Sequence, residues 1–134
     1  MDEKITVELT REQAYAVMNA TELLARLEIG QFREITFNFL ERFTTPDGKY
    51  DSARREKVDA QLEEVCKEIF GVNIYGWPNI EKKSILHERC WAVYETIRYA
   101  LAWHDHPEGG NTVNFNKPLG YGEPFPKCKV EDVL

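Results

Sequence analysis

The chain has 134 residues, 43% of them hydrophobic and 30% charged, and its formal net charge is −6. These values are ordinary for one soluble globular domain over 1–134, which can bury a core without a disulfide or a metal. The acidic balance argues against nucleic acid as a partner, because affinity for DNA or RNA comes from basic residues that neutralise phosphates.

The cysteines and the apolar runs indicate where the protein acts. Cys66, Cys90 and Cys128 are widely spaced and form no CxxC pair, which is typical of free thiols in a reducing compartment. The first ten residues hold no apolar stretch of the kind that a secretory signal needs. No run approaches the roughly 18 apolar residues that cross a membrane. We therefore expect a cytoplasmic protein that has no membrane partner.

The first predicted elements are a short strand and a long helix. Apolar and polar residues alternate over 5–9, a pattern that predicts a β-strand. Thr10 and Gln13 then have capping-box spacing, so we expect a helix that runs to about Glu28 and stops at Gly30. Its apolar face should contain Ala14, Val17, Met18, Thr21, Leu24 and Ala25.

Two further helices follow, separated by a turn. Helical spacing of apolar residues predicts a second helix over about 31–42, and its apolar positions are Phe32, Ile35, Phe39 and Phe43. Pro46-Asp47-Gly48 is a strong turn signal. A third helix is predicted over about 52–69, and its inward-facing residues are Val58, Leu62, Val65, Cys66 and Ile69.

The last predicted helix is long and precedes a proline-rich tail. Pro78 suits the first turn of a helix, which we expect over about 79–103. Its core residues are Leu86, Cys90, Val93, Ile97, Ala100 and Leu101. Short alternating pieces near 112–115 and 127–130 predict two strands. The expected fold is mainly α, a bundle of about four helices with short β-strands at the N-terminus and in the C-terminal tail.

His104-Asp105-His106 stands where the fourth helix should end. His104 continues its apolar face, whereas His106 precedes Pro107 and lies past the helix end. Zinc needs three or four ligands, and the other donors lack zinc-finger spacing. We therefore predict no metal and no cofactor, and interpret His104 as a helix C-terminal histidine that the helix dipole stabilises. No catalytic motif is present, although a small hydrolase using His104 or His106 stays an alternative.

A second face of the fourth helix has an unusual composition. His87, Trp91, Tyr94 and Arg98 share this face, where a solvated helix would carry Lys and Glu. It could be buried within a central helix, meet a second subunit, or bind a ligand by stacking a ring on the aromatics and pairing an anion with Arg98. Arg89 flanks the core, where a buried arginine would need a carboxylate or an anion.

Two segments of the chain resemble a group of short proteins encoded in phages and prophages. The first is ARLEIGQFREI, in which Arg26, Gly30, Gln31 and Phe32 match, and the second is PEGGNTVNFNKPLGYGEPFPK at 107–127. The group has no assigned activity, so the resemblance implies no catalytic residue. It implies an accessory protein inside an infected bacterium, such as one that blocks host defence. Gln31, at the predicted start of the second helix, could place an anion near free backbone N–H groups.

These features lead to one main hypothesis and two alternatives. The main hypothesis is a non-enzymatic homo-oligomer that binds a small anionic ligand such as a nucleotide signal. The predicted ligand-binding residues are Arg26, Gln31, Arg89, Trp91, Tyr94, Arg98, Trp103, His104 and Tyr121. The second hypothesis is a protein–protein inhibitor or adaptor that acts on a host protein, and the third is the hydrolase described above.

Overall fold

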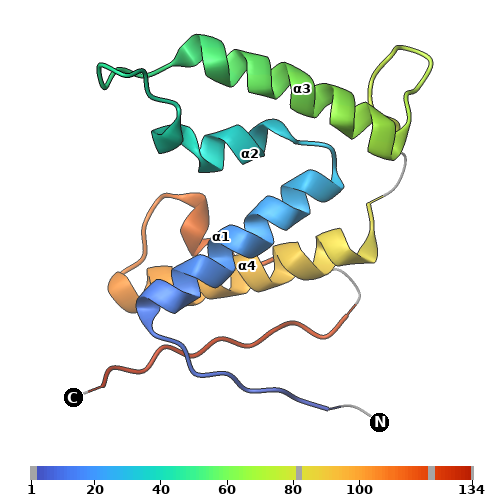
Figure 1. Ribbon diagram of the computed structural model, residues 1–134. Helices are drawn as coiled ribbons and strands as arrows, with labels where there is room; N and C mark the ends of the chain where they lie inside the picture. The colour runs from blue at the N-terminus through green and yellow to red at the C-terminus, as the bar shows by residue number, and fades with distance from the viewer. Residues whose placement is uncertain (1–2, 81–82, 121–122, 134) are drawn as a thin grey trace. The chain divides into compact units, whose positions relative to one another are not determined.

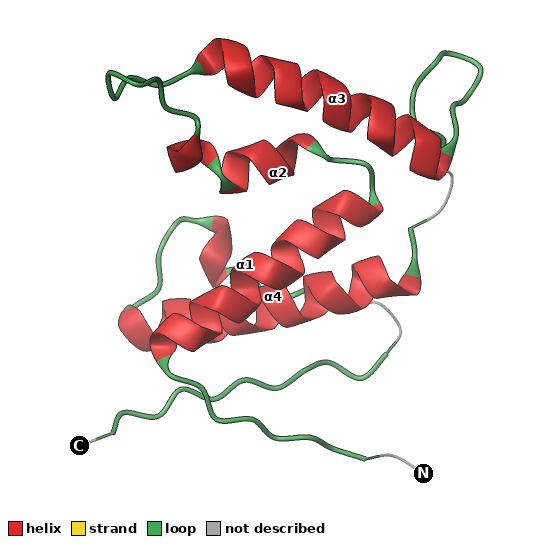
Figure 2. Ribbon diagram, in the orientation of Figure 1, coloured by secondary structure: helices red, strands yellow, loops and turns green. Residues whose placement is uncertain are grey.

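We describe residues 3–80, 83–120 and 123–133 of a computed structural model of the chain (Figure 1). Over these residues the elements are α1 (Arg11–Glu28), α2 (Arg33–Asn38), η1 (Leu40–Arg42), α3 (Ser52–Phe70), α4 (Ile85–Asp105) and η2 (Val113–Phe115). η1 and η2 are short 3-10 helices. The fold is mainly helical, as the sequence predicts, and the helices are joined by loops (Figure 2).

The short β-strands predicted at the two ends of the chain are absent from the described residues. Residues 3–9 and 127–130 form no β-bridge with any described segment, and 112–115 contains the turn of 3-10 helix η2. β-pairing within the described ranges is limited to two isolated bridges, Thr44–Tyr50 and Val72–Pro78. The predictions were wrong because alternation fits a segment for a strand, but a strand exists only when its backbone groups pair with a neighbour.

Local capping signals set the bounds of α1 as predicted. The Thr10 N–H donates to Oε1 of Gln13, and the Gln13 N–H donates to Oγ1 of Thr10, which completes the capping box. At the other end, the Gln31 N–H donates to the Arg26 carbonyl and the Gly30 N–H to the Leu27 carbonyl. This is a Schellman motif, and Gly30 supplies the positive φ of 80° that it needs.

The second predicted helix is interrupted. It begins at Arg33, two residues later than expected, and ends at Asn38, because Phe39 leaves helical angles (φ −111°, ψ 22°). The Asn38 side chain donates to the Glu34 carbonyl at 2.7 Å, and the chain continues as η1. This tighter turn precedes Phe43, which is buried, whereas Phe39 is exposed.

The fourth helix starts at Ile85 and not near Asn79. Pro78 is held in the bridge with Val72, and the Asn79 N–H donates to the Gly71 carbonyl at 3.0 Å. These backbone groups close the loop after α3, so they cannot begin a helix. Ser84 caps α4 instead, because its hydroxyl accepts a hydrogen bond from the His87 N–H at 3.0 Å.

The chain divides into two compact units. Unit 1 comprises Met1–Glu22 and Arg89–Leu134, and unit 2 comprises Leu23–Glu88. In unit 1 the buried side chains include Cys90, Glu95 and Leu101 of α4. Arg11 at the start of α1 makes a two-pronged ion pair with Asp105 at the end of α4, with N–O distances of 2.8 and 3.0 Å. These two helix ends therefore meet in unit 1.

The core of unit 2 combines apolar and polar side chains. Its buried apolar residues are Ala25, Phe32, Phe43 and Cys66, and α2 packs against α3. Between these helices the Thr36 hydroxyl donates to Oδ1 of Asp59 at 2.6 Å, and Arg55 Nε donates to the same hydroxyl at 3.1 Å. The buried Asp59 carboxylate is thus satisfied inside the unit.

Several residues predicted to face the core are exposed instead. They are Leu24, Phe39, Val65, Ile69 and Leu86. On α3 the buried face is centred on Asp59 and Cys66, so Val65 and Ile69 fall at its edge. The periodicity predicted the correct helix. Because Asp59 is buried in contact with Thr36, however, the buried face of α3 differs from the face on which its apolar residues are centred.

Candidate functional site

The aromatic and arginine cluster predicted on α4 forms as a stack of side chains in unit 1. The Trp91 and Tyr94 ring centroids are 5.3 Å apart, and the Arg98 guanidinium carbon lies 5.0 Å from the Tyr94 centroid. Arg98 Nη1 also donates to the Tyr94 hydroxyl at 3.4 Å. All three side chains are half-buried, and His87, on the same helix face, is buried. This face of α4 is therefore not a solvated one.

Burial affects two polar groups of this cluster, the Tyr94 phenol and the Arg98 guanidinium. It raises the pKa of the Tyr94 phenol, an effect that the Arg98 hydrogen bond partly opposes. Within the described residues, the buried Arg98 Nε has no hydrogen-bond partner. A buried donor without an acceptor is uncommon and costs free energy, so it marks this arginine as a candidate contact for an anion.

Two other predicted binding residues are held by side-chain partners. Arg89 is exposed, not buried as expected, and makes an ion pair with Glu123 whose shortest N–O distance is 2.8 Å. The expected carboxylate partner is therefore present, whereas the expected burial is not. Arg26 Nη1 donates to Oε1 of Gln31 at 3.0 Å, across the turn that ends α1. Gln31 precedes α2 instead of lying in it.

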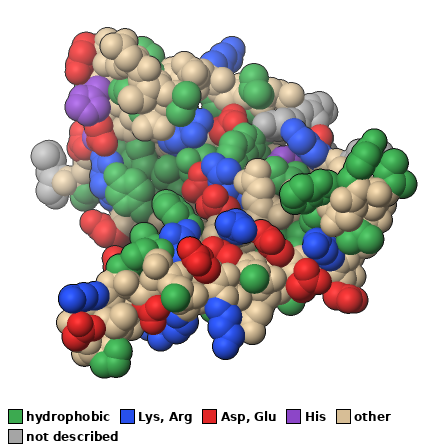
Figure 3. All heavy atoms as spheres, turned by 90° about the horizontal axis from the view of Figure 1, so that it is seen from above, with side chains coloured by type: hydrophobic (Ala, Val, Ile, Leu, Met, Phe, Trp, Pro, Cys, Tyr) green, Lys and Arg blue, Asp and Glu red, His purple; other side chains and the backbone are tan. Residues whose placement is uncertain are grey.

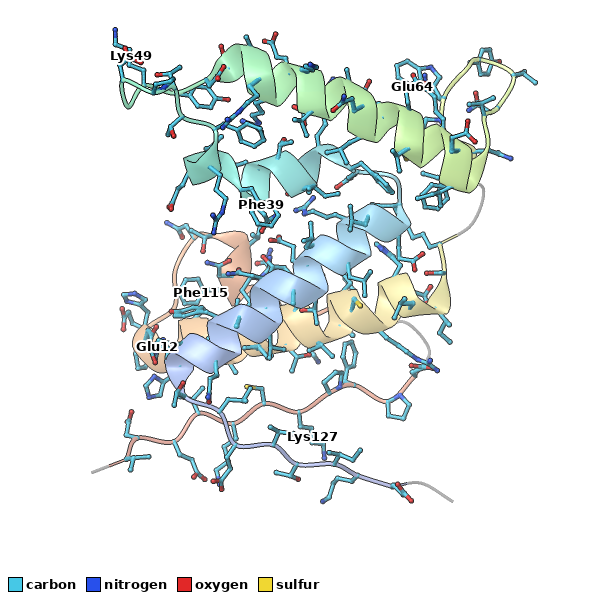
Figure 4. All side chains as sticks on the ribbon, in the orientation of Figure 1. Glu12, Phe39, Lys49, Glu64, Phe115 and Lys127 are labelled. Carbon is cyan, nitrogen blue, oxygen red and sulfur yellow. The ribbon has the colours of Figure 1, made fainter. Side chains whose placement is uncertain are left out.

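Trp103, near the end of α4, packs against the start of the C-terminal tail. Its indole N–H donates to the Phe115 carbonyl at 3.3 Å, and the two rings meet edge to face at 5.4 Å (Figure 4, Phe115 labelled). Gly109 has the positive φ, 85°, predicted for the double glycine, and a Cβ there would lie 3.1 Å from the Trp103 ring. Trp103 thus has a packing role, and Tyr121 lies outside the described residues.

His104 lies in the middle of a row of charged side chains in unit 1. Its Nδ1 lies 3.1 Å from Oδ1 of Asp105, which also binds Arg11, and its Nε2 lies 2.9 Å from Oδ1 of Asp132. The hydrogen bond to Asp105, assisted by that to Asp132, raises the pKa of His104. Both ring nitrogens therefore face carboxylates, an arrangement that favours the imidazolium and links α4 to the C-terminal segment.

This geometry predicts a pH-dependent contact. Because the folded-state pKa of His104 is raised, its stabilising contribution is complete below the unfolded value of about 6.5 and is lost as pH rises through the folded value. We expect Asp132→Asn to lower the His104 pKa in an NMR titration. Glu131→Gln is the matched control, because Glu131 pairs with Lys129 and does not contact His104. An equal pKa in wild type and Asp132→Asn would contradict this assignment.

The most exposed group of large apolar side chains in unit 2 lies on the 71–78 loop, which sequence reasoning interpreted only as a loop. Ile74, Tyr75 and Trp77 are 91%, 78% and 68% exposed. Figure 3 shows hydrophobic side chains gathered at the right, where this loop follows α3 in Figure 1. The signal that could have revealed it is the concentration of Ile74, Tyr75 and Trp77 around Gly76, where turn residues are normally polar.

The 71–78 loop is closed by hydrogen bonds at its base and tip. The Asn73 N–H donates to the Trp77 carbonyl at 2.8 Å, and the Asn73 side-chain oxygen accepts from the N–H groups of Tyr75 and Trp77 at 2.9 and 3.1 Å. Gly76 adopts a φ of 80°, and the Val72–Pro78 bridge closes the base. The apolar side chains are therefore displayed on a backbone that is already ordered, which lowers the entropy cost of binding.

A hollow on the described surface of unit 2 is formed by a single stretch of chain. It has a volume of about 480 Å³ and is lined by the continuous run 37–42 alone, which includes the exposed Phe37 and Phe39. It lacks the convergent polar groups from several elements that a ligand site usually has. Among the described residues, no three His, Cys, Asp or Glu side chains gather as metal ligands would, and no helix has the length and apolarity needed to cross a membrane.

Comparison with known proteins gives no relative from which a function could be transferred. No protein-family model, curated protein or solved structure matches the chain. A function for this chain is therefore inferred from its own residues.

Proposed function

We propose that this protein is a protein–protein inhibitor or adaptor that binds its target through the 71–78 loop. The observation that carries this proposal is the display of Ile74, Tyr75 and Trp77 on a hydrogen-bonded loop. Tyr and Trp dominate the binding energy of protein interfaces, because they bury a large area at a small loss of side-chain freedom. The resemblance to short phage-encoded proteins makes a host protein the expected target.

Charge and exposure elsewhere in unit 2 support the same proposal. Val65 and Ile69 on α3 and Val72 at the start of the loop are also exposed, so exposed apolar side chains occur both at the end of the helix and in the loop that follows it. Glu64 and Glu68 lie beside them on α3 and are exposed. An apolar centre with a charged rim is the usual anatomy of a protein interface.

The test is a comparison of captured proteins between wild type and the double variant Tyr75→Ser/Trp77→Ser. Both side chains are mostly exposed, so we expect the free energy of unfolding to change by less than about 0.5 kcal/mol. We expect a host protein to be retained by wild type and its retention to fall by at least roughly ten-fold on the variant, because interface aromatics often contribute 2 kcal/mol or more.

A matched control distinguishes this loop from general stickiness. Phe37→Ser/Phe39→Ser removes two exposed aromatics from the 37–42 run of the same unit and leaves the loop intact. The control should retain the target. Equal loss on both double variants, or equal capture on all three proteins, would contradict binding through the 71–78 loop.

A second candidate, the binding of a small anionic ligand, is favoured by Arg98. Its Nε is buried and has no partner among the described residues, and its guanidinium stacks on Tyr94. A thermal-shift screen of nucleotides tests this, since a ligand at 100 times its dissociation constant stabilises by about 2.7 kcal/mol. The shift should vanish in Arg98→Ala, and the absence of any shift with wild type would remove this candidate.

The hydrolase alternative gains no support from the histidines. A general base needs a free ring nitrogen, whereas both nitrogens of His104 face carboxylates. His106 is exposed at the end of α4, with Nδ1 3.5 Å from Glu108 and its ring near Phe115. Neither histidine lies beside a nucleophile in the described contacts.

A further inference from the structure

The 3–9 segment of unit 1 is an extended stretch that leaves its apolar residues in water. It runs as a long irregular trace before α1 (Figure 1), and Ile5, Val7 and Leu9 are 85%, 67% and 44% exposed. Within the described part of the chain, none of its backbone N–H or C=O groups makes a hydrogen bond. The segment therefore has backbone groups that are open to pairing and an apolar row that is not buried.

These two properties together are those of a strand that lacks a neighbour. Alternation places Ile5, Val7 and Leu9 on one side of an extended chain, and β-branched residues favour that conformation. Unpaired N–H and C=O groups along such a segment readily pair with another strand. Among the described residues no segment is hydrogen-bonded to this one, so its backbone groups are open to a strand of another molecule.

The charges of the segment are complementary to those of a second copy of the same chain. When two 3–9 segments lie antiparallel with full overlap, Thr6 is opposite itself and Ile5 is opposite Val7. In this register Lys4 of each copy is opposite Glu8 of the other, so two oppositely charged cross-strand pairs form. A register centred on Val7 would place Lys4 opposite Thr10, which is already the cap of α1.

We propose that two copies of this chain associate by antiparallel pairing of their 3–9 segments, with Thr6 on the two-fold axis. One face of the two-stranded pair carries the apolar rows of both copies, with Glu3 opposite Leu9 at each end, and the other carries the two Lys4–Glu8 pairs. This places the homo-oligomer contact in this segment and not on the second face of α4. The contact does not involve the 71–78 loop, so it stands or fails separately from the proposed function.

Sedimentation equilibrium from low micromolar to millimolar concentration tests the association. A two-stranded pair is only marginally stable by itself, so we expect a weak, concentration-dependent dimer of the wild-type chain. Lys4→Glu places acidic residues at all four positions, and Glu8→Lys places basic residues there. Each substitution should weaken dimerisation by roughly ten-fold or more, because like charges directly opposite each other destabilise a strand pair.

Two rescue experiments identify the partner and the register. An equimolar mixture of Lys4→Glu and Glu8→Lys should form a heterodimer, since every cross-strand pair is then oppositely charged. The double variant Lys4→Glu/Glu8→Lys should dimerise like wild type, because it exchanges the two charges and keeps the net charge. Lys117→Glu and Glu12→Lys are the controls for net charge, since both residues are exposed and lie outside the segment.

Amide exchange provides an independent structural readout. Exchange of the peptide that contains residues 3–9 should slow as wild-type concentration rises and stay fast in Lys4→Glu at the same concentration. A wild-type chain that stays monomeric over the whole range overturns the proposal. A dimer that the single variants leave intact, that neither rescue restores, or that leaves exchange of 3–9 unchanged also overturns it, and places the interface elsewhere.

Discussion

Replacing Asp59 with alanine should lower the free energy of unfolding by about 2–4 kcal/mol. Asp59 is 7% exposed and accepts a hydrogen bond from the hydroxyl of Thr36, a residue that is 1% exposed. Its loss removes the shorter of the two acceptors of that buried hydroxyl, leaving the Arg33 carbonyl at 3.1 Å, and removes the carboxylate that lies 3.9 Å from Arg55. A buried group that loses its partner costs about 1–3 kcal/mol, and a buried ion pair that loses one member costs more.

Urea denaturation of three variants would separate the parts of this effect. Asp59→Asn keeps an acceptor oxygen and removes the charge, so its loss should be intermediate. Glu64→Ala removes a carboxylate from the exposed side of the same helix, where it pairs with Lys67 at 3.4 Å. That surface pair should contribute no more than about 1 kcal/mol. Equal losses for Asp59→Ala and Glu64→Ala would show that the buried contacts of Asp59 contribute no more to the free energy of unfolding than an exposed ion pair does.

Gly30→Ala is the second substitution with a large expected effect, a loss of about 2–4 kcal/mol. Gly30 has a φ of 80°, and a non-glycine residue in the left-handed region costs about 1–2 kcal/mol. An added Cβ would also lie 2.3 Å from Cδ1 of Ile80, so that side chain would have to move. Such overpacking usually costs about 1–3 kcal/mol, towards the lower end here because the atom is at the tip of a flexible side chain.

Gly48→Ala is a matched control for the backbone part of the cost. Gly48 has a φ of 83°, and a Cβ there would meet nothing within 4 Å. Its loss of stability should therefore reflect the left-handed backbone alone, about 1–2 kcal/mol. The difference between the two glycine variants in urea denaturation measures the steric contact with Ile80. No difference between them would mean that Ile80 moves at no cost.

Sequence reasoning succeeded where structure is decided locally. The capping box at Thr10 and the glycine at Gly30 fix the two ends of α1, and both signals lie within a few residues of the bonds that they make. Local signals of this kind did not predict where α4 begins. Pro78 favours a helix start by itself, but its pairing with Val72 commits it to the loop after α3.

The side-chain contacts of the candidate sites show the same limit. The spacing of Trp91, Tyr94 and Arg98 on one face of α4 was enough to predict that these side chains lie together. By contrast, Glu123 is far along the chain from Arg89, and Asp132 is far from His104. No periodicity connects such residues, because only the path of the chain between them brings them together.

The composition of the two units has a consequence for the order of events during synthesis. Unit 2 is a continuous piece, Leu23–Glu88, inserted between the two pieces of unit 1. Its residues leave the ribosome before the second piece of unit 1 emerges, so it can complete its contacts first. Unit 1 must bring Arg11 to Asp105 across the intervening chain. Prior folding of the inserted piece shortens that search, since loop-closure entropy grows with the length of flexible chain between the ends.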